Sequence, residues 1–333
     1  MKDVFIRISQ FISAVSIVLN LYLLYVYLRC PLKMIQSYKY FFLLAALQDI
    51  ILSICILLTV PTLISENFST IFIGIGPLRV QSGGQVLIVI FALIFMTSLL
   101  LVANSFIYRY LKVCKPHFFK TSLNPRVLLV AVLFNGAATG NWCIMIAVSV
   151  WPSEEFIGGL SGMVARMTGL NSSECAQLGF SMKFGVTPVT LTILTEGGVS
   201  VLLTAIVIAY SAVKISRTLK KSAFSKNLRK LHQQMFVLLL LQTACPFALL
   251  QVPLFSAYIQ LFTGFSSNTA ISYTITILLS LFPVLSPIII VFFLRDYRSY
   301  TLSAIRKCAG RKAVQSVLVS KMKTNQATAQ PAQ

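Results

Sequence analysis

Seven long stretches of mostly apolar residues recur along this chain of 333 residues. A helix needs about 20 consecutive apolar residues to cross the hydrocarbon core of a bilayer, which is about 30 Å thick. The stretches lack the polar face of a helix at the surface of a soluble protein. We therefore predict an all-α membrane protein, a bundle of seven transmembrane helices. The predicted helices cover residues 8–28, 40–64, 84–108, 127–150, 193–213, 235–262 and 270–294.

The composition excludes the main alternative classes. Hydrophobic residues make up 57% of the chain and charged residues 11%, whereas a soluble globular protein has about 45–50% and about 25%. Too few charges are present to cover a water-facing surface, and a disordered chain needs low hydrophobicity. The net charge of +20 would suit nucleic acid, but the basic residues are divided among short segments between apolar stretches. A nucleic-acid partner is therefore not expected, and the lipid bilayer is.

The distribution of basic residues predicts the orientation. Of the 28 Lys and Arg residues, 23 follow predicted helices one, three, five and seven, and five lie on the other side. Basic loops stay in the cytoplasm, so we expect the N-terminus outside and the C-terminus inside. Two N-glycosylation sequons, at Asn67 and Asn171, fall in predicted outer loops and favour the same topology. The five basic residues on the outer side are Lys2, Arg7, Arg79, Arg166 and Lys183.

Residues 1–298 are expected to form the transmembrane domain, and residues 299–333 a cytoplasmic tail. The tail opens with a short stretch that suits an amphipathic helix on the membrane surface and continues into a polar, disordered segment. Cys308 is a candidate for palmitoylation; an ordinary free cytosolic cysteine is the alternative. Cys175 is the one cysteine expected in an outer loop, so a loop disulfide is not predicted.

One acidic residue, Asp49, falls inside predicted helix two. Ionisable groups are costly in a membrane and by default suggest a functional site. Asn20 and Asn104 are the polar groups expected to reach Asp49. Two interpretations stay open: a polar switch or cation site in the bundle core, and a structural hydrogen-bonded contact.

The end of predicted helix three carries Tyr108, Arg109 and Tyr110. One interpretation is a conformational lock that rearranges to admit a G protein, and the other is an anchor at the membrane interface, where Tyr and Arg are common. Helices six and seven contain prolines that remove backbone donors and kink helices. Such kinks suit a switch, although proline is also common in membrane helices. These prolines are Pro246, Pro253, Pro283 and Pro287.

Catalytic motifs are absent from the sequence. No zinc-protease, nucleophile-elbow or phosphate-loop pattern is found, and no CxxC pair suggests a metal site. The two histidines, His117 and His232, fall in predicted inner loops. We therefore expect no enzyme activity, no cofactor and no bound metal.

Several short motifs resemble those of nematode serpentine chemoreceptors of the Str superfamily, without separating its Str and Srd branches. Ser286 stands where an Asp often precedes the helix-seven proline in that family. Leu78 stands where a Cys often follows the Gly-Pro before helix three. The motifs are Tyr38-Lys39-Tyr40, Ser105-Phe106-Ile107-Tyr108-Arg109-Tyr110, Cys114-Lys115-Pro116, Gln242-Thr243-Ala244-Cys245-Pro246, Phe282-Pro283, Ser286-Pro287 and Leu294-Arg295-Asp296-Tyr297-Arg298.

The resemblance implies a seven-helix G-protein-coupled receptor for odorants or other environmental chemicals, located in the plasma membrane of sensory cilia. It implies that Arg109 faces the G-protein cavity and that Pro246 is a pivot of helix six; Pro287 joins them as a candidate switch residue. The ligand is expected among the outer halves of the helices. Depth alone selects Gln85, Glu196, Gln251, Tyr258 and Tyr273 as candidate ligand contacts.

A membrane transporter or ligand-gated channel is the alternative. It needs a continuous polar path through the bundle, and Asp49, Asn20 and Asn104 are too few to outline one. No internal repeat supports an inverted-repeat transporter.

Overall fold

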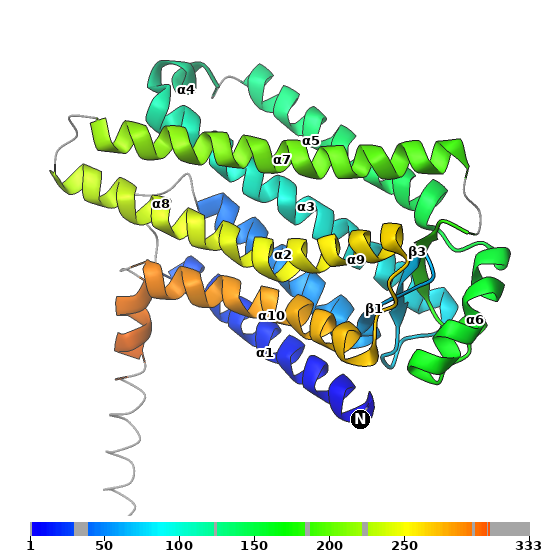
Figure 1. Ribbon diagram of the computed structural model, residues 1–333. Coiled ribbons are helices and arrows are strands. Elements are labelled where there is room, and N and C mark those ends of the chain that lie inside the picture. The colour runs from blue at the N-terminus through cyan, green and yellow to red at the C-terminus, as the bar shows by residue number, and fades with distance from the viewer. Residues whose placement is uncertain are drawn as a thin grey trace, which may run out of the picture.

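A computed structural model describes residues 2–29, 39–122, 125–183, 187–221, 226–294, 297–304 and 306. Seven of its helical segments are long and apolar enough to cross a membrane, and they run side by side in one bundle (Figure 1). This confirms the predicted seven-helix fold class. The helices are α1 (Lys2–Arg29), α2 (Lys39–Thr59), α3 (Gln81–Cys114), α4 (Pro116–Ser122), α5 (Pro125–Met145), α6 (Glu154–Thr168), α7 (Pro188–Lys221), α8 (Lys226–Pro246), α9 (Val252–Thr263) and α10 (Thr269–Phe293).

Several helices are longer than the apolar stretches predicted. Helices α3 and α7 have 34 residues each, which at 1.5 Å per residue is about 50 Å. That length exceeds the hydrocarbon core, so their polar turns continue beyond the apolar part. A count of apolar residues detects only the middle of such a helix.

Two of the seven spans change helical type part-way. The fourth span continues from α5 into the π-helical segment η2 (Ile146–Val150). The sixth consists of α8, the π-helical segment η4 (Phe247–Gln251) and α9. Pro246 ends α8 directly before η4, which fits the missing donor of proline. π-Helical turns are rare and are frequent at functional sites.

The second span is shorter than predicted, because the expected helix 40–64 ends at Thr59. Residues before a proline avoid the α region, and Val60 precedes Pro61 with a positive φ of 44°. The chain then turns into strand β1 (Pro61–Glu66), so the last residues assigned to this helix lie in a sheet.

A three-stranded antiparallel sheet, which the sequence analysis missed, covers one end of the bundle (Figure 1). We call this the sheet end. Strand β1 pairs with β2 (Ser69–Gly74) through a hairpin whose two turn residues, Asn67 and Phe68, both have positive φ, as a two-residue type I′ turn requires. Strand β3 (Gln177–Ser181), from the segment between the fourth and fifth spans, pairs with β2. The sheet thereby joins the segment between the second and third spans to the segment between the fourth and fifth spans.

Helix α6 lies beside the sheet and belongs to the same segment as β3 (Figure 1). The Ser153 side chain caps it by accepting from the Phe156 amide, and Gly169, at φ 68°, ends it. Phe156 and Leu160 pack against Ile71 and Ile73 of the sheet. A short 3-10 segment, η3 (Ser172–Glu174), follows before β3.

The bundle packs most closely around α1, α2, α3 and α10. Helix α1 contacts α2 and α10, and α3 contacts α2 and α7. At the end opposite the sheet, residues 297–304 are helical, and Tyr297 is buried in a cluster with Leu23, Val26 and Ile290. This opposite end therefore has a packed core of its own.

Candidate functional site

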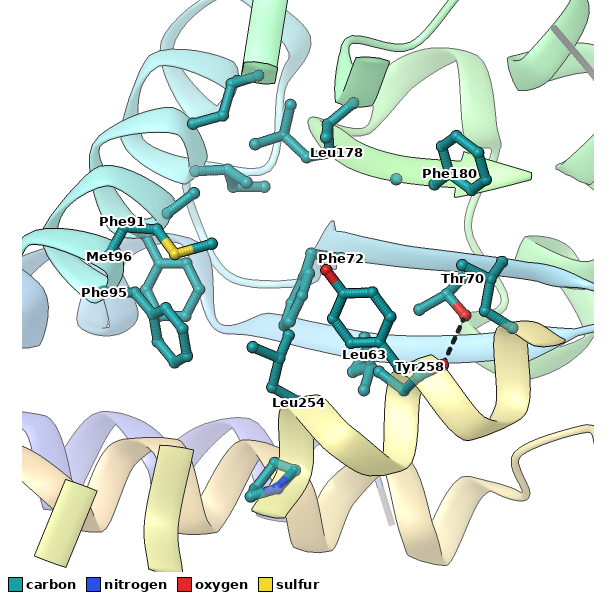
Figure 2. A pocket seen from close by; sticks show the side chains of 18 of the residues that line it. Leu63, Thr70, Phe72, Phe91, Phe95, Met96, Leu178, Phe180, Leu254 and Tyr258 are labelled. Carbon is teal, nitrogen blue, oxygen red and sulfur yellow. Dashed lines mark hydrogen bonds between the residues drawn. The ribbon is translucent and has the colours of Figure 1, made fainter. Parts of the chain in front are cut away.

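A cavity of about 160 Å³ lies directly beneath the sheet. Strands β1, β2 and β3 form its roof, and α3, η2, α7, η4, α9 and α10 contribute to its walls. Figure 2 shows side chains from the strands and from two helices converging on this space. Residues from seven separate stretches of the sequence therefore meet at one site. Representative lining residues are Phe72, Phe91, Met96, Leu178, Leu254 and Ile275.

The cavity lining is almost entirely apolar. Three of its side chains carry a hydroxyl group: Thr70, Ser149 and Tyr258. The Thr70 hydroxyl lies 2.9 Å from Ser65 Oγ and donates to the Ala257 carbonyl at 3.5 Å. A cavity of this kind suits a small molecule that is mostly apolar and carries few polar atoms.

Both π-helical segments reach the cavity. Segment η2 contributes Ile146, Ser149 and Val150, and η4 contributes Leu250. The change of helical register therefore lies at the cavity wall in the fourth and sixth spans. No residue of the sequence indicated the change at η2, whereas Pro246 was a signal for the change in the sixth span.

Of the five residues selected by depth, Tyr258 lies in the cavity lining. Gln85 instead joins α3 to β3, because its Nε2 donates to the Gln177 carbonyl at 2.9 Å and its Oε1 accepts from the Gln177 amide at 3.0 Å. It thus supports the roof from outside the lining. Gln251 is buried in η4 and also lies outside the lining.

The other two candidates lie farther from the cavity. The Tyr273 ring stacks on Phe5 with centroids 4.0 Å apart and lines a separate, much smaller space among α1, β1, α6 and α10. Glu196 is exposed on α7 and accepts a 2.7 Å hydrogen bond from Asn141 of α5. The five candidates therefore do not form one cluster.

A second, smaller cavity of about 60 Å³ lies deeper in the bundle and contains Asp49. Ser286 of α10, Gln242 and Pro246 line the same space. Asp49 thus shares a cavity with Ser286, which stands where the resembling family often has an acid. The residues that line this cavity thus come from the second, sixth and seventh spans, among others.

The expected contact of Asn104 with Asp49 is wrong. Asn104 Nδ2 donates to Asn135 Oδ1 of α5 at 2.6 Å, because its side chain is on the face of α3 that packs against α5. Asn20 also has other partners: its Nδ2 donates to the carbonyls of Pro283 at 2.8 Å and of Ser16 at 3.0 Å.

The Asn20 contact compensates for a proline. In a regular helix, the amide of residue 287 would donate to the carbonyl of residue 283, and Pro287 has no such amide. Asn20 supplies the missing donor from the neighbouring helix. This side chain therefore connects α1 to the proline-containing part of α10.

Arg109 is fully buried near the end of α3, opposite the sheet. Its neighbour Tyr108 contacts the rings of Phe41 and Phe119, with centroids 5.5 and 5.3 Å apart. Tyr110 lies beside Tyr210 of α7, at 6.0 Å between centroids. Tyr108 and Tyr110 thus contact different neighbouring helices.

The two sequons lie at the sheet end, and both asparagines are exposed. Asn67 is in the hairpin turn, and Asn171 caps η3 by accepting from the Ser173 amide. Cys175 is a buried free thiol near this end, and burial raises its pKa. Cys308 falls outside the described residues.

The amino-acid sequence of this chain is similar to those of known proteins. A family model described as serpentine type 7TM GPCR chemoreceptor Str matches residues 5–302, nearly the whole chain. The chain belongs to this family. It is also 24% identical over 316 residues to the G-protein coupled receptor str-33 of Caenorhabditis elegans, with 90% of each chain covered.

Family membership confirms the resemblance drawn from the sequence motifs. It makes the chain a serpentine chemoreceptor with a receptor role, in a family that is not enzymatic. Among the described residues, no group of three His, Cys, Asp or Glu side chains is placed to hold a metal ion. The apolar lining of the cavity beneath the sheet makes it a candidate site for a small organic molecule.

Proposed function

We propose that this receptor binds a small environmental chemical, an odorant or a soluble compound, in the cavity beneath the sheet and activates a heterotrimeric G protein. The single observation that carries the proposal is the apolar cavity of about 160 Å³, lined by residues of the strands and of five spans. An apolar site of this size suits a volatile or sparingly soluble molecule. Tyr258 is the ligand contact we retain in this cavity.

The sheet end would face the outside of the cell. Both sequons, at Asn67 and Asn171, are exposed there, and 23 of the 28 basic residues follow spans that end at the opposite face. The positive-inside rule supports the same orientation. The plasma membrane of a sensory cilium is the proposed location.

The switch would run from the cavity to the opposite end through the sixth and seventh spans. Leu250 lines the cavity, and Pro246, four residues away along the same span, lines the smaller cavity with Asp49. A ligand that binds one packing of these helices more tightly shifts the population toward it. Arg109, buried in this structure, would become accessible to the G protein in the other packing.

The test is ligand-dependent G-protein activation in a reporter cell that carries a promiscuous G protein. Wild type and Arg109→Ala are compared at matched surface expression over a panel of volatile and soluble chemicals. A ligand response that is lost in Arg109→Ala supports the proposal, and an equal response in both contradicts the role of Arg109. A ligand-evoked current without G-protein activation would instead support the channel alternative.

A further inference from the structure

The cavity offers one hydroxyl group that is free to contact a ligand. The Thr70 hydroxyl already has partners. The Ser149 oxygen has no hydrogen-bond partner among the described residues, but surrounding atoms cover it, so a ligand in the cavity would not reach it without a rearrangement. Tyr258 is different. Figure 2 shows its ring reaching from α9 toward the strands, with the hydroxyl pointing into the space that the labelled residues surround.

Within the described part of the chain, no residue forms a hydrogen bond with the Tyr258 hydroxyl. A tyrosine hydroxyl in buried surroundings usually has such a partner, because a polar group without one is destabilising in an apolar environment. The lining around it supplies aromatic rings and aliphatic chains, such as Phe72 and Leu254. The site is thus complementary to an apolar molecule that brings one polar atom of its own.

Resting on the proposed function, we infer that the Tyr258 hydroxyl is the specificity-determining donor for a single oxygen atom of the ligand, as in a small ketone. The ligand's hydrocarbon body would fill the apolar remainder of the cavity. A purely apolar molecule of the same shape would leave the hydroxyl unpaired and bind less tightly. Discrimination by an unpaired buried polar group is stronger than discrimination by one extra methylene group.

The cavity volume limits the size of the ligand. A dry apolar cavity of about 150 Å³ in another protein binds benzene, and this cavity measures about 160 Å³. A ring of six carbons with one added oxygen therefore suits it. Cyclohexanone and methylenecyclohexane form a matched pair of probes, since they differ in whether an oxygen or a CH₂ group completes the double bond.

The experiment measures binding of both probes to the full chain in lipid nanodiscs by ligand-observed NMR titration. Ala92 lies in the cavity lining, so Ala92→Trp fills part of the cavity. The signal of this variant defines the background that arises from probe dissolved in lipid. Wild type is compared with Tyr258→Phe, which removes only the hydroxyl. Tyr273→Phe is the matched control, because this tyrosine is outside the cavity and stacks on Phe5.

We expect wild type and Tyr273→Phe to bind the ketone on the order of ten-fold more tightly than the alkene, and Tyr258→Phe to bind both about equally. A preference that persists in Tyr258→Phe, or that is lost in Ser149→Ala instead, would overturn the inference. Equal cavity binding of both probes by wild type would also overturn it while leaving the apolar site in place.

Binding of neither probe above the Ala92→Trp background would overturn both this inference and the proposed ligand site. The signalling part of the proposed function is separate, since the binding experiment contains no G protein. A ketone preference that depends on Tyr258, without G-protein activation by any chemical, would support the inference and contradict the proposed signalling.

Discussion

Replacing Asn20 by leucine tests whether this side chain compensates for the missing backbone donor of Pro287. The substitution keeps the branched shape and the number of heavy atoms of the side chain, and it removes the 2.8 Å hydrogen bond from Asn20 Nδ2 to the Pro283 carbonyl. Because Asn20 is fully buried, water cannot replace it. The carbonyl is then left without a donor in the middle of the bundle.

The magnitude follows from two contributions. Hydrogen bonds between membrane helices average about 0.6 kcal/mol and reach about 1.7 kcal/mol, and an unpaired buried polar group costs about 1–3 kcal/mol. We expect Asn20→Leu to lower the free energy of unfolding by about 1.5 kcal/mol. In a Pro287→Ala background, the restored amide can donate to the Pro283 carbonyl, so the cost should fall to about 0.5 kcal/mol.

The assay is a double-mutant cycle, with the free energy of unfolding measured by denaturant titration in detergent micelles. The coupling between the two substitutions should be about 1 kcal/mol. Asn104→Leu is the control, because Asn104 donates to the Asn135 side chain and its cost should not depend on Pro287. An equal cost of Asn20→Leu in both backgrounds would refute the reasoning.

Three further predictions concern the sheet end. Asn67→Gln and Asn171→Gln should each remove one glycosidase-sensitive increment of mass on gels, and no increment in wild type would contradict the proposed orientation. The raised pKa of Cys175 keeps its thiol protonated near neutral pH. Maleimide labelling of this thiol should therefore be slow, accelerate as the pH rises, and go to completion after denaturation. Fast labelling of Cys175 at pH 7 would contradict its burial. Gly179→Ala places a Cβ 2.5 Å from Ile71 Cγ2 and 2.6 Å from the Thr70 carbonyl, so we expect lower thermal stability, measured as Tm, than for Gly158→Ala, where the Cβ meets open space.

The sequence predicted the spans because each one depends on a local property, the length of an apolar stretch. The error at 40–64 arose because residues 61–64 continue a mostly apolar stretch, and a short apolar stretch does not by itself distinguish a helix from a buried strand. Pro61 was the signal for the end of the helix, since the residue before a proline avoids the α region. Helix α6 also had local signals that were not used: Ser153 before two glutamates, and Gly169 at the other end.

The sheet was harder to predict because it depends on a long-range contact. Strand β2 pairs with β3, more than 100 residues later, and no periodicity within either strand specifies that partner. Its hairpin turn, Asn67-Phe68, lacks the usual glycine. Once the sheet is missed, the roof of the cavity is missed with it.

The dependence on long-range packing also explains why four of the five candidate ligand contacts lie outside the cavity lining. Depth in the membrane selected Tyr258, which lies in the cavity lining, but depth does not specify the direction of a side chain around its helix. Gln85 and Tyr273 lie at a similar depth, and their partners are Gln177 and Phe5. Choosing among such residues requires the rotation of each helix, which depends on packing against the others.

The most direct test of the central claim is ligand activation of a receptor whose cavity has been filled. Reporter-cell dose–response curves for an activating chemical would compare wild type, Ala92→Trp in the cavity lining and Ala137→Trp on an exposed face of α5, at matched surface expression. We predict that Ala92→Trp abolishes the response or shifts it to much higher concentration, while Ala137→Trp responds as wild type does. An unchanged dose–response curve for Ala92→Trp would contradict the claim that the cavity beneath the sheet is the ligand site.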